Sequence, residues 1–106
     1  MVQRYPGDMP TPCGFSQSKV QLAPGVLLVE TAGHGGILVG KRVAKELLSE
    51  KARKIGRVWG NYLAFEEDCD WAAVLYEHPE WQKSNPAQAK MAAEACLRRW
   101  NPEYFA

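Results

Sequence analysis

The sequence has few of the residues that usually mark a metal-binding, secreted or membrane protein. Its three cysteines, at positions 13, 69 and 96, form no Cys-x-x-Cys pair, so neither a disulfide scaffold nor a standard zinc site is predicted. No apolar run approaches the length of a membrane span, and the first residues lack the apolar core of a signal peptide. We therefore expect a protein of the reducing cytoplasm.

A strong net charge is also lacking. The formal net charge is +1, which gives no argument for a nucleic-acid or membrane partner. The charges are nevertheless segregated along the chain. Segment 41–57 is rich in Lys and Arg, whereas segment 66–80 holds acidic residues and no Lys or Arg. This segregation of charge either steers a ligand or partner, or it only reflects charged side chains on solvent-exposed faces.

The chain of 106 residues suits one domain with a single core. Residues 1–17 contain three prolines and two glycines, which predicts an irregular arm, and we place the single domain at 18–106. Runs of β-branched and aliphatic residues bounded by turn residues predict strands. These strands are 19–23, 26–31 and 37–39, and the aromatic stretch 57–65 is either two short strands or one strand entered through a turn.

The spacing of apolar residues elsewhere predicts two or three helices. One runs from the end of the 37–39 strand to Gly56, a short one contains Trp71, and a last one opens with Asn85 as its N-cap and Pro86 in its first turn. The apolar stripe of the last helix is predicted to be Ala89, Ala92, Ala93, Cys96, Leu97 and Trp100. The predicted class is α+β: a small antiparallel sheet, with a hairpin around Gly33–Gly36, covered by these helices.

The glycine stretch Gly33–Gly36, which contains His34, raises a specific question. Glycine weakens a strand, so it marks either a turn that needs a positive φ or a place where something approaches the backbone closely. Successive N–H groups in such a turn can bind an anion, and histidine can donate to an oxyanion or act as a base. Lys41 and Arg42 follow one short strand later, and they are either solvated residues or a phosphate-binding rim beside the glycines.

The second candidate stretch is acidic and reads Glu66-Glu67-Asp68-Cys69-Asp70-Trp71. Four acids around one thiol raise its pKa, which disfavours a reactive thiolate unless His34 or a helix N-terminus offsets them. Cys69 is equally well explained as a small buried hydrophobe. Adjacent carboxylates rarely converge on one ion without ligands from elsewhere, so we predict neither a metal nor another cofactor.

Together, the stretches TAGHGGILV and FEEDCDWA resemble a small domain family of unknown function found in bacteriophages, prophages and plasmids. The family pattern is TxGHGG followed by [YF]EEDCxWA, often with a tail similar to LRRWNPEYF, and the resemblance covers about Val29–Phe105. The sequence departs from it at Gly40, where a serine commonly opens the helix, and at Leu63-Ala64, where a Gly-Trp pair is common. The resemblance implies a protein of a mobile element that acts in the cytoplasm of a bacterial host cell.

Small proteins of such elements often antagonise host defence by binding, so the resemblance implies a binding protein rather than an enzyme. We expect it to block a host immune protein or to sequester a nucleotide signal, and homo-oligomers such as a dimer are common for small domains. The predicted ligand-binding residues are Gly33, His34, Gly35, Gly36, Lys41, Arg42, Glu66, Glu67, Asp68 and Trp71.

Two alternatives remain open at this point. The first is a hydrolase or transferase with Cys69 as nucleophile, His34 as base, and Asp68 or Glu67 orienting the histidine. The second is purely structural: His34 bonds to Glu66 or Asp68, and the two stretches only hold each other in place.

Overall fold

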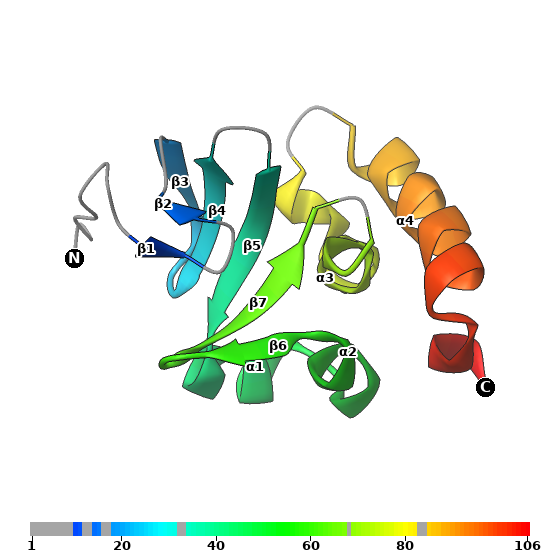
Figure 1. Ribbon diagram of the computed structural model, residues 1–106. Helices are drawn as coiled ribbons and strands as arrows, with labels where there is room; N and C mark the ends of the chain where they lie inside the picture. Colours follow the sequence, from blue (N-terminus) through cyan, green and yellow to red (C-terminus); the bar gives the residue numbers. More distant parts are fainter. Residues whose placement is uncertain (1–9, 12–13, 16–17, 32–33, 68, 83–84) are drawn as a thin grey trace.

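A computed structural model of the chain describes residues 10–11, 14–15, 18–31, 34–67, 69–82 and 85–106 (Figure 1). Five strands form one antiparallel sheet in the order β3-β4-β5-β7-β6. Their bounds are β3 Ser18–Ala23, β4 Val26–Thr31, β5 His34–Gly40, β6 Arg57–Trp59 and β7 Tyr62–Glu66. The predicted β4–β5 hairpin is confirmed, and the stretch 57–65 contains two strands.

A short antiparallel pair precedes the sheet. It consists of β1 (Pro10–Thr11) and β2 (Gly14–Phe15), so the segment expected to be irregular contains two paired strands.

The described part of the chain contains four α-helices and two 3₁₀ turns, which confirms the α+β class. They are α1 Lys41–Leu47, α2 Glu50–Ile55, α3 Trp71–Glu77, η1 Pro79–Trp81, α4 Pro86–Trp100 and η2 Pro102–Phe105. Figure 1 shows α3 and α4 beside one face of the sheet, with α1 and α2 at its lower end. None of these helices is both long enough and apolar enough to cross a membrane.

The stretch predicted as one helix ending at Gly56 is instead two helices, because the chain leaves helical geometry at Leu48 and Ser49. The Ser49 hydroxyl accepts a hydrogen bond from the Ala52 amide and so caps α2. Glu77, at the end of α3, accepts hydrogen bonds from the Ser49 amide at 2.8 Å and from the Ser49 hydroxyl at 2.5 Å. The spacing of apolar residues did not predict the break between α1 and α2, because the carboxylate that holds Ser49 belongs to Glu77, far along the chain.

The sheet buries side chains on both of its faces. Toward the helices, residues such as Phe65, Ile37 and Val26 form the main core with Ala52, Ala73, Leu97 and their neighbours. On the opposite face, a second cluster consists of Leu27, Val29, Leu38 and Ala64, with Trp59 and Tyr62 packed against it. Each fully buried large side chain contributes about 1.5–3 kcal/mol. Two-sided burial explains why β4 and β5 read as nearly continuous apolar runs.

Helix α4 begins as predicted, with the Asn85 side chain accepting a hydrogen bond from the Gln88 amide and Pro86 in the first turn. The stripe predicted for it is wrong at Ala92, which is exposed, and at Trp100, which is 57% exposed. The chain turns into η2 directly after α4, and Tyr104 and Phe105 contact the Tyr76 ring of α3 edge-on. These two rings, rather than Trp100, complete the core at this end.

Candidate functional site

The glycine stretch and the acidic stretch meet across two neighbouring strands. Gly36 of β5 lies directly opposite Glu66 of β7, and the Glu67 amide donates to the Gly35 carbonyl at 3.0 Å. Of the predicted site residues, Gly33, Asp68 and the side chain of His34 lie outside the part of the chain that the structure describes. The predicted bond from His34 to Glu66 or Asp68 therefore stays a prediction.

Gly35 and Gly36 act by allowing close approach and not by forming a turn. Both lie in β5, and among the described glycines only Gly25 and Gly60 have a positive φ. A Cβ atom on Gly36 would lie 2.9 Å from the Phe65 carbonyl oxygen, and one on Gly35 would lie 3.2 Å from the Glu67 carboxylate. The positive-φ interpretation is thus wrong for these two glycines, since the neighbouring strand and its acid occupy the space of a side chain.

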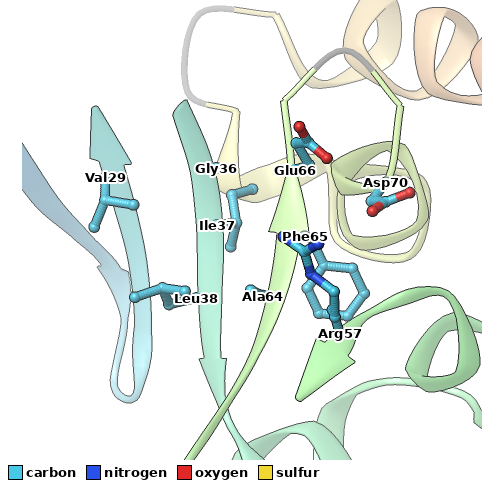
Figure 2. A pocket seen from close by; sticks show the side chains of 9 residues that line it. All are labelled: Val29, Gly36, Ile37, Leu38, Arg57, Ala64, Phe65, Glu66 and Asp70. Atoms are coloured by element: carbon cyan, nitrogen blue, oxygen red, sulfur yellow. The ribbon is translucent and has the colours of Figure 1, made fainter. Parts of the chain in front are cut away.

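An acid–thiol cluster follows β7. A carboxylate oxygen of Glu66, one of Asp70 and the sulfur of Cys69 lie within 4.8 Å of one another. Figure 2 shows Arg57 of β6 extending along β7 toward the end that carries Glu66. Arg57, Glu66 and Asp70 border a small hollow on the face of the sheet that bears Val29. The volume of this hollow is only about 10 Å³. Small-molecule sites usually measure several hundred Å³, so this hollow is too small to enclose one.

The environment of this cluster raises the pKa of two of its groups, Asp70 and Cys69. Burial raises the pKa of Asp70, the negative charge of Glu66 adds to the rise, and Arg57 opposes it. Burial, followed by the charge of Asp70, raises the pKa of Cys69. A nucleophilic thiol needs the opposite shift, so these surroundings give the Cys69 enzyme hypothesis no support.

Trp71, which was predicted to pack beside a ligand, begins α3 and is partly buried against the main core. Trp71 also lines a groove of about 310 Å³ together with α4 residues such as Ala89 and Cys96, and its contact with a ligand stays a prediction.

Lys41 and Arg42 lie at the opposite end of β5 from Gly35 and Gly36. Lys41 follows Gly36 by five residues, at the end of β5, and at a rise of about 3.3 Å per residue their backbones are roughly 16 Å apart. The structure therefore does not bring them together into the predicted phosphate rim. Instead, Lys41 and Arg42 lie between two open grooves of about 530 Å³ and 570 Å³.

The two grooves share these cations and differ in their other walls. The first is lined by Gly25, Gly40, Lys41, Arg42, Val43, Asn61 and Tyr62. The second, which we call the basic groove, is lined by Lys41, Arg42, Lys45, Arg53 and Leu63. Within the described chain, none of its four cations forms an ion pair. Among the residues that the structure describes, the buried Arg53 Nε atom has no hydrogen-bond partner, so this end of the guanidinium is held by packing.

Backbone hydrogen bonds fix the walls of the first groove. The Gly40 amide donates to the Gly25 carbonyl, and the Lys41 amide donates to the Asn61 carbonyl, each at 2.9 Å. Gly25 has φ +79°, and a Cβ atom there would lie 2.6 Å from Val43. The β3–β4 turn, the start of α1 and the β6–β7 turn are therefore held together before any ligand arrives.

Sequence reasoning missed Asn61 and Tyr62 as groove residues, whereas Lys45 and Arg53 belong to the basic segment 41–57 that it singled out. The basic composition of segment 41–57 was the available signal, but it does not show which cations share one surface. Asn61 and Tyr62 carry no motif, and only the β5–β7 pairing brings them beside Lys41.

The fold and its surfaces define a small α+β domain with a preformed basic groove at one end of its sheet. Residues 6–106 match the family described as a domain of unknown function, DUF7007, and the chain belongs to this family. No curated protein and no solved structure matches the chain. The expected resemblance to a family of unknown function is thus confirmed, while its bacteriophage origin stays a prediction.

Proposed function

We propose that this domain works by binding, and that its basic groove holds an anionic ligand. The observation that carries the proposal is a set of four cationic side chains that line one groove and form no ion pair with any described residue: Lys41, Arg42, Lys45 and Arg53. Like charges gathered on one surface repel each other, and an anion seated among them removes that cost.

The sizes of the cavities support binding at this place. Both grooves fall within the range of roughly 300–1,000 Å³ that is typical of ligand sites, whereas the hollow beside Glu66 measures only about 10 Å³. Backbone hydrogen bonds fix the walls of the first groove and the position of Lys41, which both grooves share, and this lowers the entropy lost on binding.

The family resemblance supports a proposal about the setting. In this proposed setting, the protein is an accessory factor of a bacteriophage or another mobile element and acts in the cytoplasm of a bacterial host. Its binding antagonises host defence, and the basic groove favours the capture of an anionic signal over the blocking of an immune protein. An acidic surface of an immune protein is the competing occupant of the same groove.

Titration calorimetry with sodium tripolyphosphate at low ionic strength tests the binding proposal. We expect the wild-type protein to bind, and the double variant Lys45→Gln/Arg53→Gln to bind about tenfold more weakly or worse, because two charge-assisted contacts are lost. Added salt weakens the binding through screening.

Lys54→Gln is the matched control, since Lys54 is exposed on α2 and does not line either groove. This variant should bind like the wild type. Absence of binding by the folded wild-type protein contradicts the proposal, and so does an equal loss in Lys54→Gln, which would indicate a general charge effect.

A further inference from the structure

We infer that the ligand of this surface is a free nucleotide with at least two phosphates, an inference that rests on the binding function proposed above. The basis is the chemical difference between the two grooves that meet at Lys41 and Arg42. One groove is lined by four cationic side chains and Leu63, and the other shares two of these cations and adds Tyr62 and Asn61. A ligand that fills both needs an anionic part joined to a planar part that forms hydrogen bonds.

The basic groove suits the phosphates. Helix α1 contributes Lys41, Arg42 and Lys45 to its lining, α2 contributes Arg53, and Leu63 of β7 completes it. A guanidinium binds two phosphate oxygens at once, and ammonium groups act as point charges beside them. Four unpaired cations match a di- or triphosphate better than a single phosphate.

The first groove suits a base. Tyr62 lines this groove, and its packing against the second hydrophobic cluster holds the residue in place. Aromatic rings stack on nucleobases, and an amide such as that of Asn61 offers both a donor and an acceptor to a base edge. An inorganic polyphosphate would bind only in the cationic half and would not use these two side chains.

The two halves are joined rigidly. The Lys41 amide donates to the Asn61 carbonyl at 2.9 Å, so the residue that begins the cationic half is bonded to the turn that carries the amide. The distance between the phosphate and base positions is therefore set by the fold. This arrangement distinguishes a nucleotide from a mixture of separate anions and rings.

The test compares ATP with tripolyphosphate by titration calorimetry in a buffer that contains EDTA. We expect ATP to bind about tenfold more tightly, since stacking and base contacts add to the same phosphate contacts. Asn61→Ala and Tyr62→Leu should reduce the ATP affinity toward that of tripolyphosphate and leave tripolyphosphate binding unchanged. Tyr62→Phe keeps the ring and should keep the ATP affinity.

The outcomes separate this inference from the binding function on which it rests. Equal affinities for ATP and tripolyphosphate overturn the nucleotide and leave the anion-binding function standing, whereas no binding of either overturns both. If a single-stranded oligonucleotide binds more tightly than ATP, the inference that the ligand is a free nucleotide is overturned. If Tyr62→Leu fails to fold by circular dichroism, Asn61→Ala decides the result, because Asn61 is exposed in its turn.

Discussion

Gly36 and Phe65 lie so close across the β5–β7 ladder that a Cβ atom on Gly36 would be 2.9 Å from the Phe65 carbonyl oxygen. This carbonyl belongs to the backbone of a paired strand, so it cannot move aside as a flexible side chain would. The glycine at this position is therefore a requirement for pairing β5, which carries Gly35 and Gly36, with β7, which ends at Glu66.

Gly36→Ala is predicted to lower the free energy of unfolding by about 1–3 kcal/mol, the usual cost of forcing a methyl group into a filled space. Urea denaturation followed by circular dichroism measures this change. An unchanged unfolding midpoint would show that β5 and β7 separate easily, contrary to the role assigned to the glycine.

Gly40→Ser is predicted to change stability in the opposite direction. Gly40 precedes α1 without any side-chain cap, at φ −54° and ψ 140°, which a serine adopts without strain. Its nearest neighbours would lie 3.7 Å or more from a new Cβ atom. A serine cap and the lower entropy of the unfolded chain together stabilise by about 0.5–1 kcal/mol. A melting temperature that fails to rise would indicate that α1 does not need this cap.

The hydrogen bond from Tyr104 to Glu77 makes stability depend on pH in the alkaline range. Burial raises the pKa of Tyr104, and the hydrogen bond to Glu77, together with the charge of that carboxylate, raises it further. The folded pKa exceeds the unfolded value of about 10, so the stabilisation is complete below pH 10. It is lost as the pH rises from there through the folded pKa.

Tyr104→Phe removes this hydrogen bond and should lower the free energy of unfolding by about 1 kcal/mol at pH 7. The variant should also lose less stability than the wild type between pH 9 and pH 11. Urea denaturation across this range measures both effects. Parallel alkaline losses in the two proteins would assign the effect to another tyrosine.

The thiol of Cys69 should react slowly with iodoacetamide. Burial and the neighbouring Asp70 raise its pKa, so the midpoint of labelling against pH should lie above the ordinary thiol value of about 8.5. Asp70→Asn should lower this midpoint, because the negative charge is removed. Peptide mapping by mass spectrometry follows Cys69 separately from the other cysteines. A midpoint well below the ordinary value would instead favour the enzyme alternative.

The candidate site shows which contacts local sequence patterns predict and which they do not. The pairing of the GHGG and EEDC stretches was expected from their presence in one small chain, and the contact between Gly35 and Glu67 bears this out. The placement of Lys41 and Arg42 beside the glycines was not correct. A strand of seven residues carries its two ends far apart, and composition alone does not measure that distance.

By itself, the sequence determined the α+β class, the main strands, the cap of α4 and the segregation of basic from acidic residues. These features follow from local propensities and from the period of the apolar residues. Only the tertiary structure decided that the helix after β5 breaks at Ser49, where Glu77 of α3 supplies the partner. It also decided which cations share a groove with Asn61 and Tyr62, because the pairing of β5 with β7 brings the two turns to one end of the sheet.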